Sequence, residues 1–360
     1  MYTKFSLSGY HFNGPLLAGL LLGLCTLISE GGCSHVPYPD SPQWRNGRFE
    51  NPPDWPRFPT VREFLRWIAT RPRSFPDFAP RVVENDGQRL REERMRPSVT
   101  WIGHATLLVQ GGGVSVLTDP IFSQRISGIY SRFAAPGVAL AKLPPIDAVV
   151  ISHNHRDHLD EASVKALGPR VHFVVPLGLA AWFRQRGLTV VTELDWWQTT
   201  EITTAAGHKA QITLVPAQHW SRRGLTDDRA TLWGGYVLAL GGVRVYFAGD
   251  TGYPAAFKEI GRRFANLDYA LLPIGAYEPR WFMCPQHISP EDAARAFHDL
   301  GARHLIPMHY ATFRLSDEPM DEPPRLLQQA LGKDIDHLIE LAIGETHWQV
   351  GTPPFSDLRP

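Results

Sequence analysis

The residues best suited to chemistry in this sequence form one short run, HNHRDH, from His153 to His158. The run follows the apolar segment IDAVVIS, so we expect it to lie in a loop directly after a buried strand. Neutral imidazole and carboxylate side chains are good ligands for Zn²⁺. Such closely spaced ligands converge only if the backbone coils around the ion, and one loop cannot complete two tetrahedral sites. Further ligands are therefore expected from later loops.

Three more candidate ligands each follow an apolar, strand-like segment. His219 comes after QITLVPAQ, Asp250 after VRVYFAG, and His309 after HLIPM. An aspartate that directly follows so apolar a strand would otherwise be costly to bury. Functional side chains of α/β folds gather on loops at strand ends. We therefore predict that these three residues join the HNHRDH run in one metal centre.

The elements that must position these residues begin near Ser98. Residues 98–110, SVTWIGHATLLVQ, are predicted to form one strand, and the glycines at 111–113 a hairpin turn into the strand VSVLTDP. Helices are expected at residues 177–185, 254–263, 290–300 and 324–330. In the third of these, Ser289 has the position of an N-cap and Pro290 that of the first helical residue. Strands that alternate with helices indicate an α/β fold.

The spacing H-x-H-x-D-H, followed by a distant His, Asp and His, resembles the signature of the metallo-β-lactamase superfamily. Within it, the chain is similar to the phospholipases D that hydrolyse N-acyl-phosphatidylethanolamine. The stretches that carry this resemblance span about residues 97–348 and include TWIGHATLLV, LPPIDAVVISHNHRDHLD, FAGDTGYPAAFKEIGRRF and PIGAYEPRWFMCPQHISPEDA. The resemblance implies a four-layer αβ/βα sandwich with two metal ions at one edge.

The resemblance also implies how two Zn²⁺ ions share the ligands. The first ion would be held by three imidazoles, those of His153, His155 and His219. The second ion would be held by Asp157, His158 and His309. Asp250 would bridge both ions. The iron-binding branch of the superfamily usually has Glu at the position of His155, so the imidazole there favours zinc and hydrolysis.

Two residues are expected directly behind the ligands. Asp119 in LTDP resembles the buried aspartate that orients a metal-bound histidine in the family. The alternative is an aspartate that only shapes the turn before Pro120. His104 in IGHAT is expected to be a hydrogen-bonded structural residue rather than a ligand.

The resemblance implies that Gln286 and His287 face the metals and the substrate, and that His287 or Asp157 transfers a proton. Arg156 stands where the related phospholipases carry a tyrosine, and its guanidinium could hold a phosphate or lie exposed in the loop. Trp220 and Trp281 adjoin the predicted site, so we expect them to contact substrate. Ordinary core packing is the alternative for the aromatic residues.

The function implied by the resemblance is that of a zinc-dependent phospholipase D. It would hydrolyse N-acyl-phosphatidylethanolamine-like lipids at a membrane surface to phosphatidate and N-acyl-ethanolamine, by a hydroxide that bridges the metals. The alternatives are a dinuclear-zinc lactonase, a soluble phosphodiesterase, or a non-catalytic envelope lipoprotein that binds lipid or metal. Basic and acidic residues each number 36, and this zero net charge argues against a nucleic-acid partner. A homodimer is left open.

The chain divides into four predicted segments. Residues 1–33 resemble a lipoprotein signal, with an apolar run too short to cross a bilayer and Cys33 at the expected processing site. This predicts a membrane-associated protein of the bacterial envelope; a retained surface anchor and a cytoplasmic protein are the alternatives. Residues 34–96 form a Pro- and aromatic-rich arm over the main domain, or a segment that touches lipid, with only one short helix near 61–69. Residues 97–350 form the hydrolase domain and 351–360 a tail.

Overall fold

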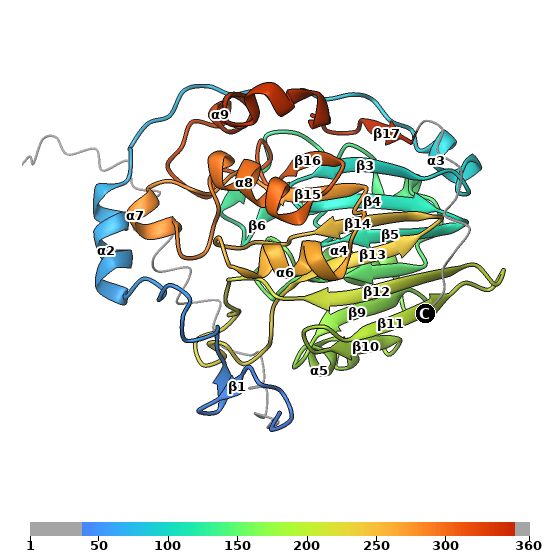
Figure 1. The fold of residues 1–360 in the computed structure, drawn as a ribbon, viewed down its shortest axis with the longest axis horizontal. Coiled ribbons are helices and arrows are strands. Elements are labelled where there is room, and N and C mark those ends of the chain that lie inside the picture. The colour runs from blue at the N-terminus through green and yellow to red at the C-terminus, as the bar shows by residue number, and fades with distance from the viewer. Residues whose placement is uncertain (1–37, 350–360) are drawn as a thin grey trace, which may run out of the picture.

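Two β-sheets packed face to face form the centre of the computed structural model (Figure 1), which describes residues 38–349. The predicted signal segment with Cys33 and the tail at 351–360 lie outside the described residues. The first sheet has the order β10-β9-β8-β5-β4-β3-β17, and the second runs from β11 to β16 in chain order.

The first sheet is parallel from β10 to β5 and antiparallel from β5 to β17. Its strands are β3 (Ser98–Gly103), β4 (Thr106–Gly111), β5 (Val114–Thr118), β8 (Ala148–Val150), β9 (His172–Pro176), β10 (Val191–Leu194) and β17 (Thr346–Trp348). The second sheet is antiparallel from β11 to β14 and parallel from β14 to β16. Its strands are β11 (Thr199–Thr203), β12 (Lys209–Val215), β13 (Gly235–Leu240), β14 (Val243–Phe247), β15 (Tyr269–Pro273) and β16 (His304–Met308).

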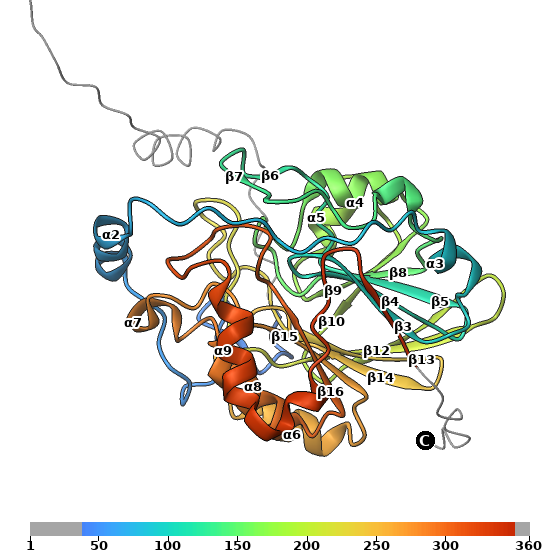
Figure 2. The ribbon, with the colours of Figure 1, turned by 90° about the horizontal axis from the view of Figure 1, so that it is seen from above.

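Helices cover the outer face of each sheet, so the molecule has four layers (Figure 2). Over the first sheet lie α3 (Gln88–Glu92), α4 (Glu161–Leu167) and α5 (Ala180–Arg184). Over the second lie α6 (Ala256–Arg263), α8 (Pro290–Leu300) and α9 (Glu322–Leu331). Two short 3₁₀ helices, Leu140–Lys142 and Gly332–His337, and a small hairpin of β6 (Arg125–Ile126) and β7 (Tyr130–Ser131) complete this part of the chain. The predicted αβ/βα sandwich is confirmed.

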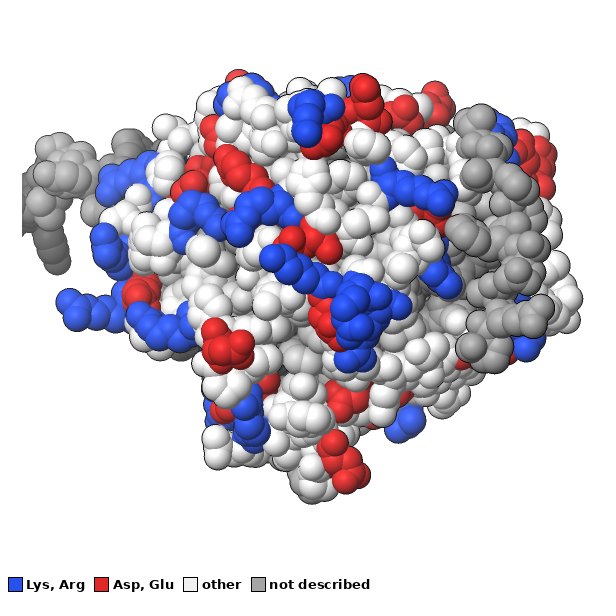
Figure 3. All heavy atoms as spheres, viewed as in Figure 1, with Lys and Arg blue, Asp and Glu red and all other residues white. Residues whose placement is uncertain are grey.

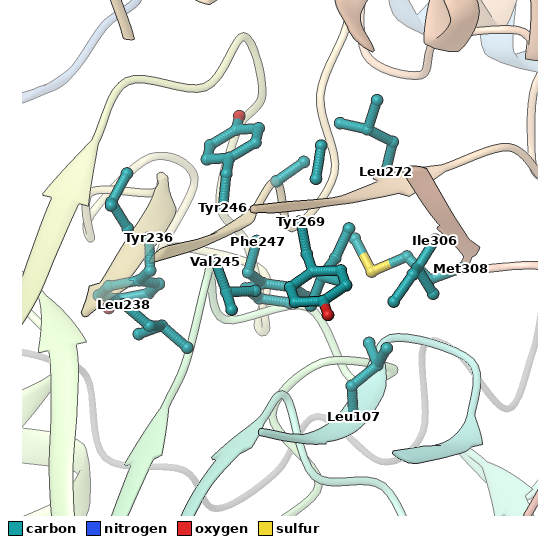
Figure 4. Close-up of a cluster of buried hydrophobic side chains, with 14 of the residues drawn as sticks. Leu107, Tyr236, Leu238, Val245, Tyr246, Phe247, Tyr269, Leu272, Ile306 and Met308 are labelled. Carbon is teal, nitrogen blue, oxygen red and sulfur yellow. The ribbon is translucent and has the colours of Figure 1, made fainter. Parts of the chain in front are cut away.

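Apolar side chains fill the space between the sheets (Figure 4). Val245 and Phe247 of β14 point toward Leu107 of the first sheet, whereas Tyr246 points to the opposite side. Val245, Tyr246 and Phe247 are all fully buried, so both faces of β14 are covered. This explains why the sequence of β14 is mostly apolar instead of alternating between apolar and polar residues.

The prediction of one strand over residues 98–110 is wrong. The chain turns sharply between β3 and β4, where Gly103 and His104 have φ of 130° and 57°. The hydroxyl of Thr312 accepts a hydrogen bond from the backbone N–H of His104 at 2.7 Å, and this contact holds the turn. The glycine turn at 111–113 and the helix at 290–300, with Ser289 as its N-cap, are confirmed.

The arm packs along the main domain and contains more regular structure than its prolines suggest. A hairpin of β1 (Trp44–Arg45) and β2 (Arg48–Phe49) turns through Asn46 and Gly47, both at positive φ, which an Asn-Gly pair adopts readily. Helix α2 (Val61–Thr70) lies beside α7 (Arg280–Met283) at one end of the molecule (Figure 1). In residues 38–349 no helix is both long enough and apolar enough to cross a bilayer.

Candidate metal centre

The predicted ligands meet at one edge of the sandwich because each lies just beyond the end of a strand. His153 follows β8 of the first sheet, and His219, Asp250 and His309 follow β12, β14 and β16 of the second. The turn before Asp250 needs glycine, because a Cβ on Gly249, whose φ is 65°, would lie 2.6 Å from the Cβ of Ser152. This close packing brings loops of the two sheets into contact.

Three imidazole nitrogens converge in a first group. Nδ1 of His155 lies 2.8 Å from Nε2 of His153 and 3.2 Å from Nε2 of His219. Tetrahedral Zn²⁺ with Zn–N bonds of about 2.0–2.1 Å separates its ligand atoms by roughly 3.3 Å. Burial lowers the pKa of His155 to about 4 and holds the pKa values of His153 and His219 well below their usual range, so all three are neutral at pH 7. Neutral imidazole is the form that binds a metal.

A second group combines two imidazoles with a carboxylate. Nε2 of His158 lies 3.2 Å from Nε2 of His309, and Oδ2 of Asp157 lies 3.3 Å and 3.5 Å from these nitrogens. Burial acts to raise the pKa of Asp157, but the charge of His158 and three hydrogen bonds outweigh it and hold the pKa well below its usual range. The carboxylate is therefore ionised and can act as a metal ligand.

Asp250 lies beside this second group. Its oxygens are 3.1 Å from Nε2 of His158 and 3.2 Å from Nε2 of His309. Its charge also acts to raise the pKa of each of the three imidazoles of the first group. The carboxylate therefore contacts the second group directly, and its charge also acts on the first; the bridging role stays a prediction.

Asp119 fixes the orientation of ligands in both groups. Nδ1 of His158 donates to its Oδ2 at 2.6 Å, and Ser152 donates to it from both its backbone N–H and its hydroxyl. Because the Ser152 hydroxyl donates to Asp119, it accepts at 2.9 Å from Nδ1 of His153. Both imidazoles therefore direct Nε2 toward the centre, the orientation in which it can bind a metal. The sequence analysis did not identify Ser152, although it directly precedes the motif.

Backbone groups and His104 hold the remaining ligands. Nδ1 of His219 donates to the carbonyl of Gln286 at 3.0 Å, and the backbone N–H of His309 donates to the carbonyl of His104 at 3.0 Å. Nε2 of His104 lies 3.1 Å from Oδ2 of Asp157. Burial lowers the pKa of His104 to about 3, so its neutral ring serves as a hydrogen-bonding partner behind Asp157.

These residues fit divalent cations. In the first group, Nε2 of His153 and Nε2 of His219 both carry lone pairs, and both face Nδ1 of His155, which has at most one proton to share between them, so a cation suits this space better than a hydrogen bond. The carboxylates of Asp157 and Asp250, which are held ionised in a largely buried centre, also need compensating positive charge. Although burial lowers the pKa of His158, these carboxylates raise it well above its usual value, which shows how strongly the site favours a cation.

A cleft of about 1180 Å³ opens onto the centre. Its lining includes His155, Arg156, Asp157, Asp250 and His287. Nδ1 of His287 is 3.8 Å from Oδ2 of Asp250, and burial lowers the pKa of His287 to about 4.

The opposite wall of the cleft comes largely from the arm, which the sequence analysis did not connect with the site. Apolar residues of both walls include Phe58, Val61, Phe64, Leu225, Phe282 and Met283. The density of aromatic residues in the arm is the signal that could have identified this wall. Trp67 of α2 stacks on Phe282 of α7 with the ring centroids 4.9 Å apart, and this contact joins the two walls.

The predicted substrate residues divide into two sets. Trp220 and Gln286 line the cleft together, where the indole N–H of Trp220 donates to Oε1 of Gln286 at 2.9 Å. Arg156 also lines the cleft and donates to the carbonyl of Arg223 at 3.2 Å. Trp281 is not brought to the metal centre: it is 42% exposed on α7 and lies under the guanidinium of Arg66.

Comparison with known proteins agrees with this geometry. The family model of a β-lactamase superfamily domain matches residues 115–310, which contain all seven predicted ligands. The chain is 39% identical over 246 residues to N-acyl-phosphatidylethanolamine-hydrolyzing phospholipase D 1 of Caenorhabditis elegans, covering 63% of this chain and 69% of the relative. It is 32% identical over 253 residues to a metal-dependent hydrolase of Methanopyrus kandleri, covering 69% and 98%. A solved metallo hydrolase from Ignicoccus hospitalis shares the fold, with a TM-score of 0.55 and 23% identity over 71% of this chain and 99% of that one.

Proposed function

The chain belongs to the metallo-β-lactamase superfamily and is a metal-dependent hydrolase, and we propose that it is a zinc-dependent phospholipase D. The proposed substrates are N-acyl-phosphatidylethanolamine-like glycerophospholipids. Water would be added across the bond between phosphorus and the ethanolamine oxygen, which releases phosphatidate and N-acyl-ethanolamine. The similarity to the Caenorhabditis elegans phospholipase D supports this choice of reaction.

The observation that best supports a lipid substrate is the composition of the cleft. One continuous space joins the ligand cluster to an apolar and aromatic wall that includes Phe58, Phe64 and Phe282. Arg156 and Arg222 line the same space and supply positive charge. A glycerophospholipid has this combination of a phosphodiester and long apolar chains, whereas a small soluble ester would leave the apolar wall unused.

The residues of the chain can divide the work of such a hydrolysis. When bound, two divalent ions supply Lewis acidity, which polarises a phosphoryl oxygen and lowers the pKa of water. The guanidinium of Arg156 would bind a phosphate oxygen through paired hydrogen bonds. For proton transfer, the geometry favours His287 over Asp157. Oδ2 of Asp157 already contacts three imidazoles, whereas Nδ1 of His287 has no hydrogen-bond partner among residues 38–349.

Zinc-loaded protein incubated with detergent-dispersed N-acyl-phosphatidylethanolamine tests the proposal. Mass spectrometry should detect phosphatidate and N-acyl-ethanolamine. His153→Ala and Asp250→Asn should each abolish both turnover and metal loading, because each removes a ligand. His298→Ala is the matched control, since this histidine is exposed on α8 and forms an ion pair with Asp334.

Other results of these assays would contradict the proposed function or support a different one. Full turnover in either ligand variant would contradict the metal-dependent mechanism. Hydrolysis of lactones or water-soluble phosphodiesters alone would identify the lactonase or the soluble phosphodiesterase. Absence of any chelator-sensitive hydrolysis would favour a lipid- or metal-binding protein.

We also propose an envelope location with a lipid on Cys33, which mass spectrometry of native protein tests.

A further inference from the structure

Helix α2 presents an apolar face to solvent. Val61, Leu65 and Ala69 follow one another at intervals of four residues and therefore form one stripe along the helix. Val61 is 76% exposed and Leu65 is 53% exposed, and Phe64 beside them is 43% exposed. A surface helix normally turns its apolar stripe toward the core, whereas Trp67 is the only buried residue of α2.

The helix is firmly formed and firmly attached in spite of this exposure. Thr60 and Glu63 form a capping box at its N-terminus. At the other end, the indole N–H of Trp67 donates to Asp317 at 2.8 Å, and Arg71 pairs with the same carboxylate at 2.9 Å. The exposed stripe is therefore held in a fixed orientation instead of belonging to a loose segment.

The apolar stripe is bordered by positive charge. Arg62 and Arg66 lie on α2 next to the stripe, and Arg66 lies over the ring of the exposed Trp281, 4.6 Å from its centroid. Among the charged side chains at the end of the molecule where α2 lies, those of Lys and Arg are more prominent than those of Asp and Glu (Figure 3). An amphipathic helix with exposed apolar residues and flanking arginines suits the interface of an anionic bilayer.

The position of this face links it to the cleft. Val61 and Phe64 belong both to the exposed face and to the cleft wall. A lipid that leaves a bilayer beneath α2 would thus pass directly into the space that leads to His155 and Asp157.

We propose that the face formed by Val61, Phe64, Leu65 and Trp281, with Arg62 and Arg66, docks onto an anionic phospholipid bilayer. This docking face rests on the proposed function, because it identifies where the lipid substrate enters. Docking on this face would place the cleft opening against the bilayer surface.

Hydrogen exchange of the full-length chain tests the docking face locally, so that lipid binding by another segment does not hide the result. Vesicles of phosphatidylcholine with phosphatidylglycerol should slow exchange in residues 61–70 and leave α9 unchanged. Vesicles of phosphatidylcholine alone should slow it less. Leu65→Glu and Arg62→Glu should each reduce this protection and reduce turnover of vesicle-embedded substrate about fivefold or more. Neither residue lines the cleft, so turnover of a monomeric short-chain substrate should remain unchanged.

Met95→Glu is the matched control, because Met95 is also an exposed apolar residue, at 62%, but lies outside the docking face. Unchanged exchange in α2 on addition of anionic vesicles, or normal vesicle turnover in Leu65→Glu, would overturn the proposal. Protection of α2 that rises with protein concentration without lipid would identify a second copy of the chain as the occupant instead. The docking face can also be tested apart from the proposed function. If no glycerophospholipid is hydrolysed, slower hydrogen exchange in α2 on addition of anionic vesicles would still support docking on this face.

Discussion

Asp119 shows how a single residue that is not itself a predicted ligand can control the metal centre. It accepts a hydrogen bond from His158 directly and fixes His153 through Ser152. These two imidazoles belong to different ligand groups. The carboxylate therefore sets the orientation of both groups from one buried position.

We expect Asp119→Asn to lower the affinity for zinc about 10–100-fold, because a neutral amide no longer fixes the two imidazoles or raises their basicity. Competition against a chromophoric chelator measures this change. Asp268→Asn is the control, since Asp268 is also buried but accepts hydrogen bonds from Arg244 and Arg303, away from the ligands. Equal zinc affinity in the Asp119 variant and the wild-type protein would contradict the orienting role.

At the scale of secondary-structure elements, helix α2 is attached to the main domain in part through Asp317. Asp317 accepts from the indole of Trp67 and pairs with Arg71, whereas most of α2 is exposed. The side chains of Arg71 and Asp317 are 17% and 11% exposed, so water screens the pair only partly.

Asp317→Ala should therefore lower the local free energy of opening of α2 by about 1–3 kcal/mol, because it leaves the Trp67 indole without its acceptor. Hydrogen exchange in residues 61–70 should become faster, while exchange in β14 stays unchanged. Asp321→Ala provides the control, since the side chain of Asp321 does not cap α9. If the amide hydrogens of α2 exchange at the same rate in both variants, Asp317 does not attach α2 to the main domain.

Elements with a strong local pattern could be predicted from the sequence, and elements set by long-range contacts could not. The cap at Ser289 and the following amphipathic run define α8 from residues close in the chain, so its bounds matched. The turn at His104 interrupts an apolar run that reads as one strand, and it depends on Thr312, distant in the sequence. The place of Phe64 in the cleft wall depends in the same way on the packing of α2 beside α7.

The candidate centre was more predictable than its surroundings for a physical reason. His153, His219, Asp250 and His309 are polar residues at the ends of apolar strands, a contrast that is visible without any structure. The predicted substrate residues do not stand out in this way from the residues around them. Trp281 lies in the same stretch of sequence as Gln286, yet it is exposed on α7 while Gln286 is buried.

At the scale of the whole molecule, the predicted ions connect the two sheets. His153, His155 and His158 follow β8 of the first sheet, and the remaining imidazoles and Asp250 come from the second. Ion binding should therefore stabilise the packing of one sheet on the other as well as the local loops.

We expect removal of the metal with a chelator to lower the free energy of unfolding by about 4 kcal/mol when zinc had been present at about 1,000 times its Kd. The melting temperature should fall by roughly 10 °C, and added zinc should restore it. Differential scanning calorimetry at matched ionic strength measures both values. The same treatment should change the Asp250→Asn variant very little, and an equal shift in that variant would show that the chelator acts elsewhere.

The arm and the ligand loops meet in one cleft but come from separate stretches of sequence. The apolar wall with Phe58 and Phe64 precedes the first strand of the sandwich, whereas the ligands follow β8, β12, β14 and β16. Substitutions in the arm can therefore alter which acyl chains are accepted while the ion-binding residues stay the same. Exchange of this segment between relatives would be a direct way to redirect substrate choice without rebuilding the reaction centre.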